Sequence, residues 1–113
     1  MAKTKAHELG RCYISGPISG RDLSVVRARF ARVADSLSRR GYLPVNPLEN
    51  GLPAHSPWEE HMAEDITTLM RCRAIYMLGD WQTSHGARLE HAIAKKMRFT
   101  DYLRKRRLCL RQN

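Results

Sequence analysis

Ala74-Ile75-Tyr76-Met77-Leu78 is an unbroken run of apolar side chains with the length of one β-strand. A strand of this composition has no polar face, so it belongs in the middle of a sheet that is covered on both sides. Sheets of that kind are parallel and carry helices on each face. The run therefore predicts the central strand of a three-layer α/β domain.

Two further strands are expected before this run. Residues 12–15 form a short apolar segment that ends in a turn rich in glycine and proline, and residues 42–47 form a second segment. The two prolines of the second segment favour an extended edge position. Because strands alternate with helical segments, the crossovers should be right-handed. The expected fold is a Rossmann-like or flavodoxin-like α/β domain with a small parallel sheet.

Three amphipathic helices are expected around these strands. The first covers residues 22–41, with apolar residues at three- and four-residue steps and Asp22 as its N-cap. The second begins at residues 56–59, where Ser-Pro-Trp-Glu matches a capping box with a proline in the first turn. Its buried face is expected to consist of Trp58, Met62, Ile66, Leu69 and Met70. The third helix begins at Ser84.

The chain has 113 residues, enough for one hydrophobic core. We expect a flexible N-terminus over residues 1–10, a folded domain over 11–97 and a basic segment over 98–113. From Lys95 to the last residue there are eight basic residues and one acidic residue, which carry most of the net charge of +9. Such a run binds nucleic acid or another polyanion, or forms a solvated face. Residues 108–110 are compatible with a short strand or a mobile tail.

Cysteine and histidine spacings argue against several kinds of site. Three cysteines without a CxxC spacing predict reduced thiols rather than disulfides or a zinc site. His55 and His61 are six residues apart, as are His85 and His91, so neither pair shares a helix face, and no metal or other cofactor is expected. The N-terminus lacks the apolar core of a signal peptide, and no segment is long enough to cross a bilayer. We therefore expect a cytoplasmic protein with no membrane partner.

Glu90 stands out in the third helix because small and apolar residues surround it. At about 100° per residue, its helix face is shared by Ala87, Ile93, Ala94 and Met97. An unpaired buried carboxylate is costly, so such a residue is usually hydrogen-bonded, protonated or retained for chemistry. The alternative is a glutamate at the edge of the apolar face that reaches solvent.

Three segments are expected to meet beyond the carboxyl ends of the strands, where parallel sheets bind ligands. They are the turn at residues 16–20, the loop at 79–84 and the start of the third helix. Ser84 is placed to cap that helix, and the N–H groups of Gly86 and Ala87 at its positive end form an anion site. The alternative is that Ser84 only caps its helix. The glycine turn matches neither the dinucleotide fingerprint nor the P-loop, which leaves a sugar or a single phosphate as its ligand.

Asp65 on the second helix adds a carboxylate near this edge, beside the apolar face of its helix. Two carboxylates in one cleft suggest glycosidic chemistry, in which one attacks an anomeric carbon and the other handles a proton. The alternative is an exposed helical aspartate.

Several of these segments resemble the small domains of the DUF4406 family. The resemblance extends from about residue 12 to 97, and its segments are residues 13–20, Asn46-Pro47, Trp58 with Met62 and Asp65-Ile66, residues 74–78 and residues 84–90. That family is in turn similar to the nucleoside 2-deoxyribosyltransferase-like superfamily. The functional analogue in the superfamily is the 2′-deoxynucleoside 5′-phosphate N-hydrolase.

The resemblance implies a role for individual residues. Glu90 would be the nucleophile that attacks C1′, Asp65 would assist departure of the base, and Tyr13 would hydrogen-bond near the nucleophile. Six residues before the nucleophile the transferases carry an aspartate and the 5′-monophosphate N-glycosidases a serine; Ser84 stands there in this chain and favours a phosphorylated substrate. The cradle for sugar and phosphate is assigned to Ser15, Gly16, Pro17, Ser19, Gly20, Ser84 and Gly86.

The expected function is hydrolysis of the N-glycosidic bond of a nucleoside 5′-monophosphate, with a deoxynucleotide as the expected substrate. The chain is shorter than the transferases, whose C-terminal segment helps to complete a neighbouring subunit's site, so water is the expected acceptor. Homo-oligomerisation is expected by the same resemblance. Two alternatives stay open: a nucleotide-binding module without turnover, and an interaction module that binds nucleic acid or an acidic protein through the segment after Lys95.

Overall fold

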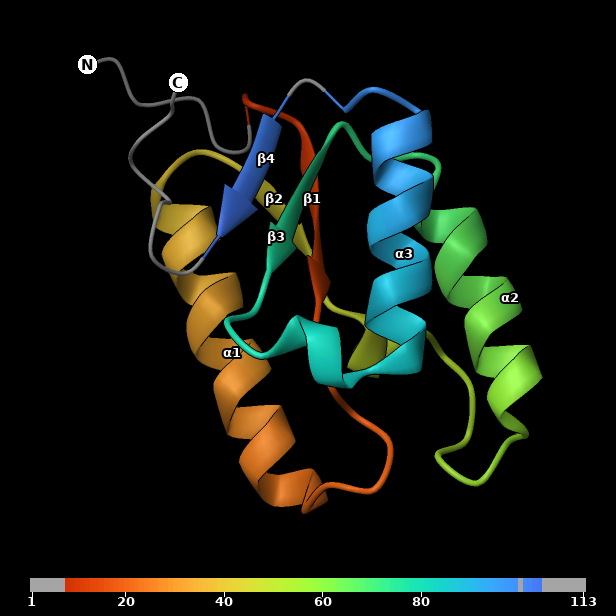
Figure 1. The fold of residues 1–113 in the computed structure, drawn as a ribbon. Helices are drawn as coiled ribbons and strands as arrows, with labels where there is room; N and C mark the ends of the chain where they lie inside the picture. Colours follow the sequence, from red (N-terminus) through yellow and green to blue (C-terminus); the bar gives the residue numbers. More distant parts are fainter. Residues whose placement is uncertain (1–7, 100, 105–113) are drawn as a thin grey trace.

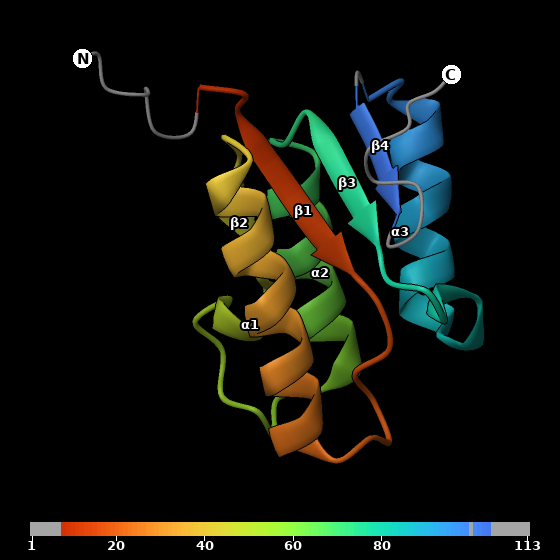
Figure 2. The ribbon, with the colours of Figure 1, turned by 90° about the vertical axis from the view of Figure 1, so that its left-hand side faces the viewer.

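In a computed structural model that describes residues 8–99 and 101–104, the chain folds into three layers (Figures 1 and 2). The sheet has four parallel strands in the order β2-β1-β3-β4. They are β1 (Arg11–Ser15), β2 (Leu43–Val45), β3 (Ala74–Met77) and β4 (Asp101–Arg104). Helix α1 (Leu23–Arg39) covers one face, and helices α2 (Trp58–Leu69) and α3 (His85–Lys96) cover the other. Two short 3₁₀ turns, η1 (Pro47–Glu49) and η2 (Trp81–Thr83), complete the described elements. The predicted α/β architecture is confirmed.

The alternation of side chains along β1 assigns each residue to one of two cores. Cys12 and Ile14 pack against α1, whereas Tyr13 packs on the opposite face with residues of α2 and α3. Ser15 follows Tyr13 by two positions, so it lies on the same face as Tyr13. All four residues of β3 are buried, as expected for a strand covered on both sides.

The sheet extends beyond residue 97, where the sequence placed the end of the domain. Strand β4 pairs in parallel with β3, with Ala74 opposite Asp101 and Met77 opposite Arg104. Because β4 has only four residues and a charged residue at each end, it lacks the apolar run that marks a buried strand in a sequence. Residues 1–7 and 105–113, which include the segment at 108–110, lie outside the described residues.

Of the two caps predicted for α1 and α2, the first forms and the second does not. The Asp22 side chain accepts hydrogen bonds from the N–H groups of Ser24 and Val25, so the predicted cap of α1 is confirmed. The predicted capping box of α2 is wrong, because its N-cap is Pro57 and makes no side-chain cap bond. The first turn closes on the Pro57 carbonyl, which accepts from the N–H groups of Glu60 and His61, and this places Ser56 outside the helix.

The buried face of α2 agrees with the prediction in its middle and differs at its ends: Met62 and Leu69 are buried as predicted, and Ile66 is partly buried. Trp58 and Met70 are 42% and 52% exposed, whereas Asp65 is 7% exposed and shares the buried face with Met62 and Leu69. Trp58 and Met70 lie at the two ends of α2, so little of the sheet is available to cover them. In α3, Met97 follows the last helical residue and is exposed, although the helix wheel placed it on the buried face.

Gly16 directly follows β1 and lies against Leu78, a core residue. A Cβ atom at Gly16 would lie 2.3 Å from the Leu78 Cδ1 atom and 2.9 Å from its Cβ atom. Leu78 is almost fully buried, so it has no room to withdraw. Gly16→Ala is therefore expected to lower the free energy of unfolding by about 1–3 kcal/mol, measured by urea denaturation.

A double-mutant cycle separates this clash from a general effect on the turn. In a Leu78→Ala background the Cδ1 and Cγ atoms are absent, and Gly16→Ala should then cost less. Equal costs in the two backgrounds would show that contact with Leu78 is not the reason for glycine at this position.

Among the described residues, no helix combines the length and the apolar composition that a bilayer-spanning segment needs.

Candidate active site

Glu90 is a buried carboxylate with two side-chain hydrogen bonds. It is 5% exposed, and Tyr13 Oη donates to Glu90 Oε2 over 2.8 Å while Ser15 Oγ donates to Oε1 over 2.7 Å. Both donors come from β1 and lie two residues apart, so the pleat of the strand directs both at α3. Glu90 is thus not the solvated edge residue that the sequence left open, and each of its carboxylate oxygens has a donor.

Burial raises the pKa of Glu90 to about 7, and the nearby charge of Asp65 adds to this effect, while the hydrogen bonds from Ser15 and Tyr13 oppose it. The pKa of Tyr13 is raised well above its usual value, mainly by burial and then by the charge of Glu90. Tyr13 therefore keeps its proton and remains a donor throughout the range in which Glu90 titrates. Near neutral pH, Glu90 exists in both protonation states.

Removing one of the two donors should raise the pKa of Glu90. In Tyr13→Phe the ionised form of Glu90 loses a charge-assisted hydrogen bond, so we expect its pKa to rise above 7 by about one unit or more. The measurement is an NMR titration of the Glu90 carboxyl carbon. Tyr76→Phe is the matched control, because Tyr76 is a buried tyrosine of the opposite core. An unchanged Glu90 titration in Tyr13→Phe would contradict this account.

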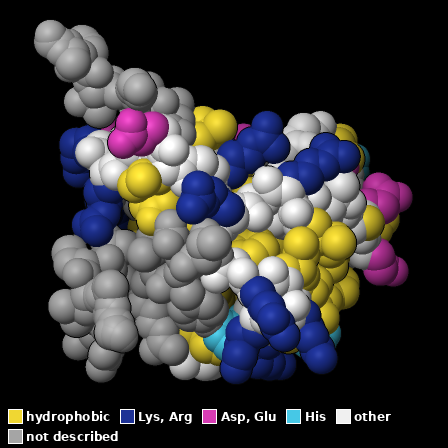
Figure 3. Space-filling model, turned by 90° about the horizontal axis from the view of Figure 1, so that it is seen from above, with side chains coloured by type: hydrophobic (Ala, Val, Ile, Leu, Met, Phe, Trp, Pro, Cys, Tyr) yellow, Lys and Arg dark blue, Asp and Glu magenta, His cyan; other side chains and the backbone are white. Residues whose placement is uncertain are grey.

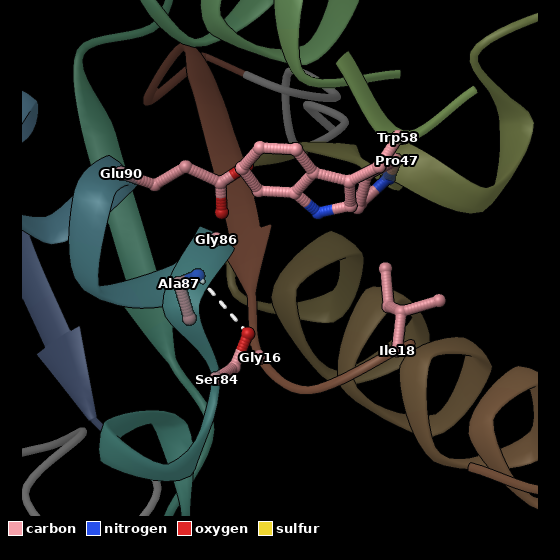
Figure 4. A pocket seen from close by; sticks show the side chains of 8 residues that line it. All are labelled: Gly16, Ile18, Pro47, Trp58, Ser84, Gly86, Ala87 and Glu90. Carbon is pink, nitrogen blue, oxygen red and sulfur yellow. Dashed lines mark hydrogen bonds between the residues drawn. The ribbon is translucent and has the colours of Figure 1, made fainter. Parts of the chain in front are cut away.

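A small cavity opens beside the Glu90 carboxylate (Figure 4). It lies between the end of β1, the first turn of α3 and the start of α2. Its volume is about 40 Å³, well below the several hundred Å³ of a typical ligand pocket, so it accepts the reacting end of a ligand rather than a whole one. Its lining consists of Gly16, Ile18, Pro47, Trp58, Ser84, Gly86, Ala87 and Glu90.

The first turn of α3 forms one wall of this cavity. Ser84 is the N-cap as predicted, because its Oγ atom accepts a hydrogen bond from the Ala87 N–H over 3.1 Å. The expectation that this N–H is available to an anion is therefore wrong. The Gly86 N–H lies in the first turn, where N–H groups have no acceptor within the helix, so it still points out of the positive end. An anion at this site has the Ser84 hydroxyl and the Gly86 N–H as donors.

A second, larger cavity of about 240 Å³ adjoins the first. The two share Ile18, Pro47 and Trp58 as lining residues, so they are neighbours on the surface of the domain. Most of the larger cavity is apolar, and Asp65 contributes a carboxylate to it. The full lining consists of Ile18, Leu23, Arg27, Pro47, Leu48, Asn50, Leu52, Ala54, Trp58, His61 and Asp65.

Asp65 is held by the amide of Asn50, which also contacts His61, and sequence reasoning missed both residues. Asn50 Nδ2 donates to Asp65 Oδ1 over 3.0 Å and lies 3.1 Å from His61 Nδ1. Burial raises the pKa of Asp65, and the hydrogen bond from Asn50 and the nearby His61 partly offset this. Asp65 is also close enough to raise the pKa of Glu90. The two carboxylates therefore influence each other across adjoining cavities.

Trp58 forms a wall of both cavities instead of packing in the core as predicted. Its ring stacks on the His85 ring with a centroid distance of 5.5 Å and an interplanar angle of 28°. This contact joins the first turn of α2 to the first turn of α3. An aromatic face bordering a cavity offers a stacking surface to a flat ligand.

The profile of one protein family, a domain of unknown function named DUF4406, matches residues 10–100. The chain belongs to the DUF4406 family. The matched span contains Glu90, both of its donors and every residue that lines the two cavities. A search of curated proteins found no match.

In this DUF4406 protein the predicted cradle residues fall into three groups. Gly16, Ser84 and Gly86 line the smaller cavity. Ser15 is fully buried and donates to Glu90, so it holds the carboxylate. The remaining three line neither of the two cavities: they are Pro17, which is buried, and Ser19 and Gly20, which are exposed.

An ion-pair cluster fixes the loop that leads into α3. Arg29 Nη2 lies 2.7 Å from Asp80 Oδ1, and Arg21 Nη1 lies 3.2 Å from Asp80 Oδ2. Arg21 Nη2 also donates to Thr83 Oγ1 over 3.0 Å. The Arg29 hydrogen bond is the main reason that the pKa of Asp80 is lowered, with Arg21 contributing. The cluster connects the DUF4406 domain's β1–α1 turn and α1 to the loop that carries Ser84.

Within the described part of the chain, no three His, Cys, Asp or Glu side chains are grouped so as to hold a metal ion.

Proposed function

We propose that this DUF4406 protein is an N-glycosidase that hydrolyses the N-glycosidic bond of a nucleoside 5′-monophosphate, with a deoxynucleotide as substrate. The observation that carries the proposal is the buried Glu90 carboxylate, which receives a hydrogen bond on each oxygen and borders a cavity. Buried carboxylates with pKa values near neutrality are typical of catalytic sites. The resemblance of residues 84–90 to the nucleophile motif of the 2-deoxyribosyltransferase-like enzymes supports the same assignment.

In the proposed reaction, ionised Glu90 attacks C1′ of the sugar and forms a glycosyl ester. The C1′–N bond breaks, its electron pair passes to the base, and Asp65 supplies a proton to the leaving base, in the protonation state in which Asp65 rather than Glu90 carries the proton. Water then attacks C1′, gives a proton to the Asp65 carboxylate and releases Glu90 and the sugar phosphate. The donors Tyr13 and Ser15 hold the Glu90 carboxylate in place through both steps.

The two cavities divide the proposed substrate into two parts. The smaller cavity takes C1′ beside Glu90 and places the 5′-phosphate towards Ser84 and the Gly86 N–H, at the positive end of α3. The larger cavity takes the base, because it is mainly apolar, has Trp58 as an aromatic wall and contains Asp65. We further propose that the protein acts in the cytoplasm, where its buried Cys12 and Cys72 remain reduced, and that it forms a homo-oligomer.

The proposal is tested by incubating the protein with a panel of deoxynucleoside and nucleoside 5′-monophosphates and measuring free base by chromatography. We expect release from at least one deoxynucleotide and none from the Glu90→Gln variant. If ligands raise the melting temperature equally in both proteins and no base appears, the cleft is a nucleotide-binding site without turnover. If no nucleotide is cleaved, the N-glycosidase proposal is wrong.

The nucleic-acid alternative rests on the segment after Lys95, most of which lies outside the described residues. Figure 3 shows the end of the molecule opposite the two cavities, where Lys and Arg side chains form several separate groups between apolar and uncharged surface. This end therefore gives no specific support to the alternative, and the site at Glu90 supports the N-glycosidase better.

A further inference from the structure

Asn50 joins a loop of the larger cavity to the carboxylate of Asp65 through a single amide group. Its Oδ1 atom accepts a hydrogen bond from the Leu52 N–H over 3.0 Å, which closes a turn in the loop. Its Nδ2 atom donates to Asp65 Oδ1 and lies 3.1 Å from His61 Nδ1. The amide oxygen and both amide hydrogens are thus engaged.

The neighbouring histidine fixes the direction of these hydrogen bonds. His61 Nε2 lies 3.1 Å from the Pro53 carbonyl, which only accepts, so Nε2 carries the ring proton. In the neutral ring, His61 Nδ1 is then an acceptor for the second hydrogen of Asn50 Nδ2. Because Asn50 donates from Nδ2, Asp65 Oδ1 is always an acceptor. With these assignments, each donor of the amide and the imidazole faces an acceptor.

We propose, on the basis of the function proposed above, that Asn50 is a positioning residue which keeps the proton of Asp65 on Oδ2, the oxygen available to the base in the larger cavity. The carbonyl oxygen of a protonated carboxyl group accepts better than its hydroxyl oxygen, so the hydrogen bond from Asn50 to Oδ1 favours a proton on Oδ2. No described residue donates to Oδ2, and Asp65 lines the cavity. Asn50 therefore determines where the leaving group receives its proton.

The proton passes from Asp65 to the leaving base in the first step and is replaced from water in the second. As the C1′–N bond breaks, its electron pair goes to the base nitrogen, the proton leaves Oδ2, and Asp65 becomes a carboxylate that still accepts from Asn50. In the second step the carboxylate takes a proton from the attacking water. Without Asn50 the Asp65 carboxyl group is free to rotate and to place its proton away from the base.

This role predicts that the effect of losing Asn50 on the cleavage rate depends on the leaving group. A natural base departs as a poor anion unless it is protonated, whereas a 4-nitrophenolate departs without a proton. A loss of proton delivery should therefore slow cleavage of a deoxynucleotide but spare 4-nitrophenyl 2-deoxyribofuranoside 5-phosphate. A loss of folding or of Glu90 should slow cleavage of both substrates.

The test compares Asn50→Ala and Asn50→Ser with the wild type on both substrates. Serine is too short to reach Asp65, but its hydroxyl can accept from the Leu52 N–H, so it retains the turn. For both variants we expect kcat on the deoxynucleotide to fall by about 10²-fold and kcat on the nitrophenyl substrate to change by less than about threefold. Asp65→Asn should show the same selective loss in the first step, followed as the single-turnover rates of base and 4-nitrophenolate release, because Asp65 also takes the water proton in the second step. Adding Asn50→Ser to it should cause little further loss in the first step.

Each contrary outcome overturns a different claim. If Asn50→Ala loses both substrates equally and Asn50→Ser keeps both, Asn50 only closes the turn and the positioning role is wrong. If both variants retain full activity on the deoxynucleotide, Asn50 has no part in proton delivery. If the wild type cleaves neither substrate, the N-glycosidase proposal itself fails, and with it the role of Asn50.

Discussion

Glu90→Gln is expected to abolish release of the base while making the fold more stable above pH 7. Glutamine is nearly isosteric with glutamate but is not nucleophilic, so the rate should fall by about 10⁴-fold or more. The Tyr13 and Ser15 hydroxyls that donate to Glu90 can rotate to suit the amide, so the cavity should keep its shape.

The gain in stability follows from the direction of the pKa change. Burial raises the pKa of Glu90 from an ordinary 4.5 to about 7, so the folded state binds the Glu90 proton more tightly than the unfolded state does. The contribution of neutral Glu90 to stability is complete below pH 4.5 and is lost as the pH rises through 7. The loss amounts to about 3 kcal/mol. Glutamine carries no such charge, so the variant avoids this loss.

The measurement is urea denaturation of both proteins at pH 5 and pH 8. The variant should be more stable by a margin that is several times larger at pH 8 than at pH 5. Glu60→Gln, at an exposed position in the first turn of α2, is the matched control, because it makes the same substitution without removing a buried carboxylate. A pH-independent difference between Glu90→Gln and the wild type would show that Glu90 is not a desolvated carboxylate.

Ser84→Asp should reverse the preference between a nucleotide and the corresponding nucleoside. Aspartate caps a helix as well as serine does, so α3 should retain its first turn. The added carboxylate would lie beside the position proposed for the 5′-phosphate, and like charges brought together in a binding site cost several kcal/mol. We expect kcat/KM for the nucleotide to fall by about 10²-fold relative to kcat/KM for the nucleoside.

The ratio of the two kcat/KM values is the informative quantity, because any effect of the new charge on Glu90 acts on both substrates alike. Ser84→Asn is the control, since asparagine also caps the helix and has a similar size to aspartate but no charge. If Ser84→Asp and Ser84→Asn change the ratio to the same extent, charge repulsion is not the cause, and the phosphate does not lie at Ser84.

The parts of the site on regular elements were predictable from the sequence. Glu90 is the one charged residue on an apolar helix face, and Ser84 precedes that helix as an N-cap, so periodicity and capping preferences locate both. The order of strands and helices places them at the carboxyl edge of the sheet. The pairing of Tyr13 and Ser15 with the two oxygens of Glu90 depends on how α3 lies over β1, which no local pattern specifies.

The loop that positions Asp65 was not predictable in the same way. Asn50 and His61 are eleven residues apart and meet only because the loop between them folds back on α2, and asparagine in a loop usually indicates no more than a turn. Trp58 was misplaced for a related reason. Its spacing from Met62 suits a buried stripe, but Trp58 is the first residue of α2, and its ring is exposed beside the cavities.

The two-residue spacing of Tyr13 and Ser15 makes both hydrogen bonds to Glu90 depend on the register of β1. An insertion or deletion of one residue within β1 would exchange its two faces, turning Cys12 and Ile14 towards α3 and both hydroxyls towards α1. In such a chain the buried Glu90 carboxylate would have no hydrogen-bond donor. The hydroxyls of Tyr13 and Ser15 would lie in the apolar core against α1. Misregistered molecules are therefore less stable, so a molecule that folds stably has a Glu90 carboxylate with a hydrogen-bond donor on each oxygen.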